Sequence, residues 1–356
     1  MDDDRNDDSG ATIHNPYGTD ESLVTLERRA RAYDEALTRS RPACAFGTLR
    51  VMSWNLQLLA GPFSGQGGFR ADLIKRARKI VQNIIVVAET VDVVCLQEVW
   101  DDASRTVLRS GLATTFPYIF SPAAKCGLMV CSKASHVCNH FVKFTHRGGI
   151  EARAFEKGVS TTYLRLAQND ACVRVAIILN THLQSDYWCS GRVARFSQLV
   201  CVRESFMRAV RECRGNGYVV ERVLLAGDIN VEHGSAEYEH MMHSIFPGAI
   251  DLMNSPLNDD DSFRLTFPVA RWRHYFLKCG RESRYFDLEP RVRIDYVMDL
   301  TPMGVSQGVP PRHKHVDSGY VNRVLCRDAR GRALSDHFPI VAMSSVFGSG
   351  TEDYSL

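Results

Sequence analysis

The chain has 356 residues, of which 45% are hydrophobic and 24% charged, a balance typical of a globular protein with a sizeable core. No stretch approaches the roughly 18 apolar residues of a membrane-spanning helix, and 11 cysteines without a C-x-x-C pair fit neither a disulfide framework nor a zinc site. The net charge of +2 is too modest for the electrostatic footprint of a strong nucleic-acid binder.

Composition divides the chain into four parts. Residues 1–19 are rich in Asp, Gly and Asn and bury too little apolar surface to fold, so we expect a disordered acidic tail. Apolar residues recur at three- and four-residue steps within 20–44, which predicts an N-terminal helical extension. Residues 45–348 are expected to form a catalytic domain, and residues 349–356 a flexible C-terminus.

Strands and helices alternate along this domain. Apolar runs predict strands, and apolar periods of three to four residues predict two long helices. The strands are expected at 49–56, 91–99, 126–133, 159–167, 173–180, 222–230, 293–300 and 338–347, and the helices at 70–89 and 191–214. The stretches 255–290 and 301–334, rich in Pro, Gly, Arg and aromatic residues, are expected to be long functional loops. This order indicates one α/β domain of two packed sheets with helices outside.

Polar side chains stand at the ends of six of these strands. They are Asn55 in SWN, Glu98 in LQEVW, Asn180 and His182 in NTHLQ, Asp228 and Asn230 in AGDIN, Asp295 in RIDY, and Asp336 and His337 in LSDHF. Each one alone is compatible with a cap or a turn. Six such strand ends that converge would gather buried polar groups, which proteins retain at functional sites more often than in cores.

The residue types in this set point to one chemistry. The oxygens of Glu98, Asn55 and Asp336 are hard ligands that suit Mg²⁺ with retained waters and a phosphate oxygen. The set contains no cysteine and only two histidines, which disfavours zinc. A histidine beside an aspartate can serve as a general base for water, and a second histidine can stabilise charge in a phosphorane-like transition state. The set therefore indicates metal-assisted hydrolysis of a phosphoester.

The ordered series SWN, LQEV, NTHL, GDIN, RIDY and SDHFP resembles the endonuclease/exonuclease/phosphatase superfamily over roughly residues 48–346. This resemblance implies a DNase I-like, four-layer αββα sandwich of two packed mixed β-sheets flanked by helices. Within the superfamily, the segments RADLIKRARKI, CGLMVCSKASH, EKGVSTTYLRL and THLQSD are most similar to neutral sphingomyelinases.

The resemblance implies a role for each residue of the set. The catalytic residues are His337 as the base that activates water, Asp295 as its orienting partner, His182 as the transition-state stabiliser, and Asp228 and Asn230 as the residues that position water or phosphate. The metal ligands are Glu98, Asn55 and Asp336, with Mg²⁺ as the cofactor and Mn²⁺ as its substitute. The substrate contacts are Lys157 and Asn180.

The chain departs from the family pattern at two places. Family members often place an Asp five residues before Lys157, where this chain has Ala152. Nuclease-like relatives orient the second histidine with a carboxylate near the strand that here begins with Ala124, Lys125 and Cys126. His182 is therefore expected to use another partner.

The implied activity is phospholipase C-type hydrolysis of sphingomyelin, or a related choline phospholipid, to ceramide and phosphocholine. A deadenylase or endonuclease, and an inositol polyphosphate phosphatase, stay open as alternatives, whereas a non-catalytic scaffold is disfavoured because all six polar positions are intact. We expect a cytoplasmic protein that contacts a phospholipid membrane peripherally and reversibly, without nucleic acid as its partner. Trp272, Tyr275 and Phe276 among basic residues, and the basic stretch 312–334, are candidate membrane contacts.

Overall fold

The computed structural model describes residues 47–59, 70–122, 124–147, 155–168, 173–185, 191–254, 267–268, 291–303, 318–321 and 334–346. The predicted acidic tail, the helical extension and the C-terminal segment lie outside the described residues. So do Trp272, Tyr275, Phe276 and most of 312–334. The domain limits and both membrane contacts stay predictions. In the described part of the chain, no helix is long and apolar enough to cross a membrane.

Two six-stranded mixed sheets form the centre of the molecule. In spatial order, the first sheet contains β13 (Ser318–Val321), β14 (Ile340–Ser345), β1 (Thr48–Leu58), β2 (Val93–Val99), β4 (Met129–Ser132) and β3 (Tyr118–Phe120). The second contains β5 (His136–Lys143), β6 (Gly158–Gln168), β7 (Val173–His182), β8 (Val219–Asp228), β12 (Asp295–Asp299) and β9 (Ile250–Asp251). A separate pair consists of β10 (Phe267–Pro268) and β11 (Arg291–Val292).

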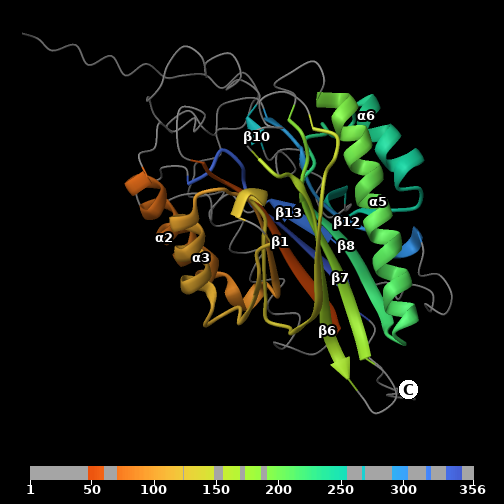
Figure 1. Cartoon of the computed structure of the whole chain (residues 1–356), viewed down its shortest axis with the longest axis horizontal. Coiled ribbons are helices and arrows are strands. Elements are labelled where there is room, and N and C mark those ends of the chain that lie inside the picture. The colour runs from red at the N-terminus through yellow and green to blue at the C-terminus, as the bar shows by residue number, and fades with distance from the viewer. Residues whose placement is uncertain are drawn as a thin grey trace, which may run out of the picture.

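Helices cover the outer faces of both sheets. The first sheet is covered by α2 (Arg70–Val86) and α3 (Asp102–Leu112), and the second by α5 (Gly191–Gly215) and α6 (Ala236–His240), so that the sheets lie between two helical layers (Figure 1). The short helices are η1 (Ala88–Thr90), η2 (Ala124–Cys126), η4 (Leu252–Asn254), η7 (Thr301–Met303) and the π-helical turn η3 (Met241–Ile245). The predicted four-layer αββα sandwich is confirmed.

Apolar stripes attach each helical layer to its sheet. In α2, Leu73, Ala77, Ile80 and Ile84 recur at three- and four-residue steps, and all are buried in the same cluster as the inner faces of the strands. Phe206 of α5 belongs to a second cluster on the outer face of the second sheet. Each large side chain buried in this way contributes about 1.5–3 kcal/mol to folding.

The predicted strands and both long helices are present, with ends shifted by a few residues. The sequence patterns missed α3, α6, β3, β5, β9, β10 and β11. The prediction of two long loops needs correction, because the stretch 255–290 contains β10. The stretch 301–334, expected to be a loop, contains β13, whose four residues pair antiparallel with β14. Four residues with two glycine or serine positions are too few for an apolar run to show.

Strand direction brings the polar strand ends to one edge of the sandwich. Strands β1 and β2 run parallel, as do β7 and β8, whereas β12 is antiparallel to β8 and β14 to β1. Gly227 permits the close approach of β7 to β8, because it has φ +147° and a Cβ there would collide with the carbonyl oxygen of Thr181. The carboxyl ends of four strands therefore face the starts of β12 and β14.

Candidate active site

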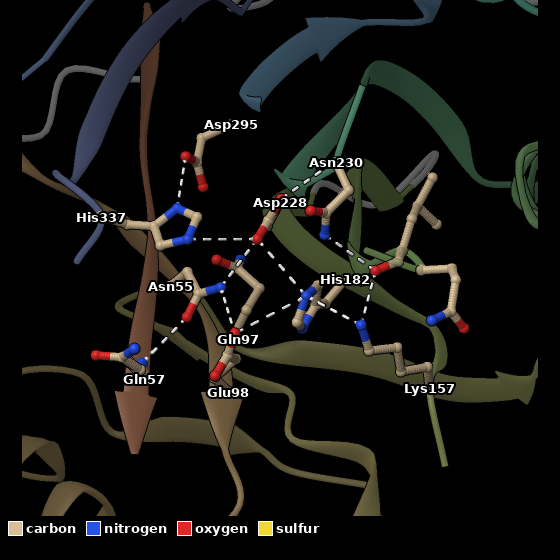
Figure 2. A network of polar contacts seen from close by, with 12 residues as sticks. Asn55, Gln57, Gln97, Glu98, Lys157, His182, Asp228, Asn230, Asp295 and His337 are labelled. Carbon is tan, nitrogen blue, oxygen red and sulfur yellow. Dashed lines mark hydrogen bonds and ion pairs between the residues drawn. The ribbon is translucent and has the colours of Figure 1, made fainter. Parts of the chain in front are cut away.

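Polar side chains from both sheets meet at this edge of the sandwich (Figure 2). On the second sheet, the strand register places His182, Asp228 and Asp295 side by side on β7, β8 and β12. The first sheet contributes Asn55 and Glu98. Asn55 Nδ2 donates to Glu98 Oε1 at 3.0 Å and to Asp228 Oδ2 at 2.9 Å, which links the two sheets across the site.

The backbone is strained at the points where three strands reach the site. Among the described residues, Gln57, Glu98 and Asn230 are the non-glycine residues with positive φ, at 50°, 56° and 54°. The pairing of β1 with β2 also shifts register between Asn55 and Leu58. Such conformations cost of order 1–3 kcal/mol each and persist where the surrounding structure holds them, most often at functional sites. Here they aim polar side chains away from the regular strand direction.

Asp228 lies at the centre of the polar network. Its Oδ1 accepts a hydrogen bond from the backbone N–H of Asn230 at 3.0 Å, and its Oδ2 lies 3.6 Å from His182 Nε2 and 3.7 Å from His337 Nε2. Burial, opposed by the charge of His337 and reinforced by that of Asp295, raises the pKa of Asp228 to about 7. One carboxylate therefore contacts both histidines.

His337 is held by a carboxylate and by the end of β1. Its Nδ1 lies 2.8 Å from Asp295 Oδ2, and its carbonyl oxygen accepts from Trp54 Nε1 at 3.1 Å. Burial lowers the pKa of His337, but the negative charges of Asp295 and Asp228 outweigh this effect and raise the pKa to about 10. The ring is thus an imidazolium at neutral pH, and its Nδ1–H donates to Asp295.

His182 has the opposite environment. Its Nε2 lies 3.2 Å from Lys157 Nζ, which also donates to the carbonyl oxygen of Leu183 at 2.8 Å. Its buried Nδ1 has no hydrogen-bond partner in the part of the chain that the structure describes. Burial, together with the positive charges of Lys157 and His337, holds the pKa of His182 well below its usual range. The expected alternative partner of His182 is therefore a lysine.

The chemistry of this cluster fits a divalent cation. Burial, reinforced by the negative charge of Asp336, raises the pKa of Glu98 above its usual value. The residues described at the site therefore lack a positive charge that would fully balance this carboxylate. Glu98, His182 and Asp228 each offer one ligand atom, and these atoms lie within 4.8 Å of one another. Two of these atoms are carboxylate oxygens, the hard ligands that suit Mg²⁺ or Mn²⁺, and the third is a ring nitrogen of His182.

Asn55 and Asp336, the other two predicted metal ligands, are placed less favourably for metal binding than Glu98. Asn55 turns Nδ2 toward Glu98, and its Oδ1 accepts from the backbone N–H of Gln57 at 3.1 Å, so ligation through Oδ1 requires the carboxamide to turn over. Asp336 Oδ2 accepts from Gln57 Nε2 at 2.7 Å. Within the described residues, Asp336 joins no group of three close His, Cys, Asp or Glu ligands. Metal binding by Asn55 and Asp336 stays a prediction.

Comparison with known proteins agrees with this arrangement. The model of the Endonuclease/Exonuclease/phosphatase family matches residues 52–337, which include every polar strand end of the site. The chain belongs to this family. Its members are phosphoesterase hydrolases, so the site is that of a hydrolase acting on phosphoester bonds.

Relatives of this family member include sphingomyelinases. Sphingomyelinase C of Leptospira interrogans is 26% identical over 219 residues, which cover 54% of this chain and only 36% of that protein. The fold is similar to the crystal structures of sphingomyelinase C from Streptomyces griseocarneus (TM-score 0.56, 21% identity, 83% of this chain and 99% of that chain), truncated Caenorhabditis elegans TDP2 (0.55, 18%, 84% and 98%) and a mutant beta toxin from Staphylococcus aureus with bound magnesium ions (0.53, 20%, 83% and 99%).

Asn180 was predicted to contact the substrate, but its carboxamide makes hydrogen bonds inside the protein. Its Oδ1 accepts from Gln97 Nε2 at 2.8 Å, and its Nδ2 donates to the carbonyl oxygens of Leu96 and Met129 at 3.1 and 3.2 Å. These bonds cross from the second sheet to the first and leave no group of the carboxamide free for a substrate. The structure therefore places Asn180 as a support of the site, and its contact with a substrate stays a prediction.

Asn230 and Lys157, the remaining predicted site residues, lie in the same polar network as Asp228 and His182. Asn230 Nδ2 donates to the carbonyl oxygen of Leu183 at 3.1 Å, next to the Lys157 contact. Gln57, which links Asn55 to Asp336, was not among the predicted site residues. The alternation of Ser53, Asn55 and Gln57 in β1 was the available signal, because polar residues at every second position share one face of a strand.

Proposed function

We propose that this family member is a Mg²⁺-dependent phosphodiesterase of the phospholipase C type that hydrolyses sphingomyelin, or a related choline phospholipid, to ceramide and phosphocholine. One observation carries the proposal: an imidazole held by a carboxylate (His337 with Asp295) lies across Asp228 from a half-buried carboxylate, Glu98, whose charge no cation among the described residues fully balances. The likeness to a sphingomyelinase C supports the choice of substrate class.

His337 is the proposed general base. Its Nδ1 is engaged by Asp295, so Nε2 is the atom that takes the proton of the attacking water. The chemistry that a bound Mg²⁺ supplies is polarisation of a phosphate oxygen and a positive charge that lowers the pKa of His337. Asp228 and Asn230, joined by a hydrogen bond, orient the water.

Lys157 and His182 are proposed to stabilise the transition state. The ammonium of Lys157 and the neutral ring of His182 lie together opposite Asp228, where the ammonium can donate to the oxygens of the phosphate. Water then forms the new bond to phosphorus, the bond from phosphorus to the ceramide oxygen breaks, and the leaving oxygen takes a proton from solvent while His337 holds the proton of the attacking water. We further propose that the protein works in the cytoplasm at a phospholipid surface, bound peripherally and reversibly.

The test compares wild type with His337→Ala on sphingomyelin vesicles in the presence of Mg²⁺. Wild type is expected to release phosphocholine, to stop on addition of EDTA and to recover with Mg²⁺, whereas His337→Ala stays inactive throughout. Lyso-phosphatidylcholine, single-stranded RNA and an inositol polyphosphate are assayed in parallel. Cleavage of RNA or of the inositol polyphosphate without release of phosphocholine would contradict the proposed substrate and leave the family assignment standing.

A further inference from the structure

Two aromatic rings border the site and have no part in the polar network. The ring centroids of Trp100 and Phe155 lie 4.3 Å apart with an interplanar angle of 35°. The ring of His182 follows at 6.4 Å from that of Trp100. Both aromatic residues are half-buried, so each keeps part of its surface open to solvent. They form an aromatic pair beside the proposed transition-state stabiliser.

The chain builds this pair from the segments that carry the metal ligand and the lysine. Trp100 follows Glu98 by two residues, and Phe155 precedes Lys157 by two. The six-membered ring of Trp100 lies on the backbone of Gly127, where a Cβ would come within 2.7 Å of three ring carbons. Gly127 has φ +68°, a conformation that favours glycine. The position of the indole ring is thus set by the backbone beneath it.

We propose that the Trp100–Phe155 pair binds the quaternary ammonium group of a choline phospholipid and so sets the headgroup preference of the site. This inference rests on the proposed function. A phosphate beside Lys157 and His182 places the choline nitrogen one ethylene bridge away, within reach of the Trp100 ring, whose centroid lies 6.4 Å from that of His182. Quaternary ammonium ions are attracted by aromatic rings, which offer a negative face without a hydrogen-bond acceptor.

The ring geometry favours this headgroup over a nucleic-acid base. Bases bind proteins by stacking flat on an open aromatic face. Trp100 and Phe155 contact each other at 4.3 Å, so no slot is left between them for a base. A trimethylammonium group is compact and needs only the parts of the two rings that do not contact each other. A base on the outer side of the pair is the competing occupant, and the test below includes it.

The experiment measures headgroup preference in variants of the pair. Wild type, Trp100→Leu, Phe155→Leu and Trp100→Phe are assayed on sphingomyelin and on ceramide phosphoethanolamine in mixed micelles. The ratio of kcat/KM values, choline over ethanolamine, is expected to fall about threefold to thirtyfold in the two leucine variants, mainly through KM. Trp100→Phe is expected to keep most of the preference. Tyr118→Leu, an exposed aromatic at the start of β3, is the matched control and should leave the ratio unchanged.

A second measurement does not depend on lipid turnover. Phosphocholine and phosphoethanolamine are compared as competitive inhibitors of the hydrolysis of bis(4-nitrophenyl) phosphate. The preference for phosphocholine should be lost in Phe155→Leu, and this variant carries the test if Trp100→Leu does not fold. Equal losses for both headgroups in the leucine variants would overturn the inference and leave the proposed function standing. A wild type that cleaves RNA but neither lipid, with that activity lost in the variants, would overturn both.

Discussion

His337 and His182 stand on two sides of the same carboxylate, yet the protein gives them opposite electrostatic environments. Their Nε2 atoms lie 3.7 and 3.6 Å from Asp228 Oδ2. His337 has a second carboxylate, Asp295, on its other nitrogen, whereas the nearest group to His182 is the ammonium of Lys157. The pKa of His337 is raised to about 10, and the pKa of His182 is lowered well below its usual range.

In the proposed mechanism, this difference gives two chemically identical side chains different roles. Carboxylates around a ring raise its affinity for a proton, and in the proposed mechanism this ring would accept the proton of water once the charge of a bound Mg²⁺ had lowered its pKa. A ring beside a lysine stays neutral, and in the proposed mechanism it meets the charge of the transition state together with the ammonium of Lys157. Both rings are almost fully buried, so the difference comes from the neighbouring charges and not from exposure to solvent.

The largest effect is expected from removal of the base. In His337→Ala, kcat on a soluble phosphodiester at saturating Mg²⁺ should fall by about 10²–10⁴-fold, because proton transfer from water loses its acceptor. His243 is a matched control, since it also lies 3.0 Å from a carboxylate, that of Glu239, but on the exposed surface. His243→Ala should leave kcat unchanged. A loss below about tenfold in His337→Ala would remove the distinction between the two histidines.

A smaller effect is expected on the other side of Asp228. Lys157→Met keeps the apolar stem and removes the charge, so the pKa of His182 should rise because Lys157 holds it down. We expect a loss of kcat of about 10–100-fold, the range seen when a group that supports a site residue is removed. The acid limb of the pH–rate profile should move to higher pH. Lys157→Arg restores the charge and should restore the limb; an unmoved limb in Lys157→Met would show that Lys157 does not control His182.

The two histidines also predict opposite effects of pH on the stability of the metal-free protein. The pKa of His337 is higher in the folded than in the unfolded chain, so its stabilisation is present below about pH 6.5 and is lost as pH rises through about 10. The pKa of His182 is lower in the folded chain, so stability is lost as pH falls below about 6.5.

Urea unfolding between pH 5 and 10 measures this contrast. His337→Gln should flatten the alkaline loss of the free energy of unfolding, which we expect to be a few kcal/mol at most. His182→Gln should flatten the acid loss instead. Each variant is compared with wild type at the same pH, so other titrating groups contribute equally to both. Flattening of the same limb by both variants would contradict the assignment of opposite environments.

The sequence predicted the fold and the meeting of the polar strand ends because both depend on strand direction and order. Asn55, Glu98, Asp228, Asp295 and His337 follow or precede apolar runs, and such runs locate strands without knowledge of their partners. Helix α3 was missed although Asp101 provides an N-cap signal, its side chain accepting from Ser104 N at 2.8 Å. A helix of 11 residues is short enough for its periodicity to be overlooked.

The partner of His182 was beyond the reach of sequence patterns. Lys157 lies 25 residues away from His182, and only the antiparallel register of β6 and β7, with Val159 opposite Thr181, brings the two together. A one-residue shift of this register would turn the lysine to the other face. The positive φ values of Gln57 and Glu98 were equally hidden, because these residue types do not favour that conformation.

Substitution of Asn180 is expected to have the smallest effect on catalysis. It tests whether this residue contacts the substrate or only supports the residues that do. Asn180→Leu leaves Gln97 Nε2 without one acceptor and should lower the free energy of unfolding by about 1–3 kcal/mol, with KM on a soluble phosphodiester unchanged. In the double variant with Gln97→Leu, the loss should be smaller than the sum of the single losses, because the donor Gln97 Nε2 and its acceptor Asn180 Oδ1 are then removed together. A rise of KM in Asn180→Leu at unchanged stability would instead return Asn180 to the substrate. The substrate-binding site would then extend along β7 from His182 to Asn180, which contacts β2 and β4.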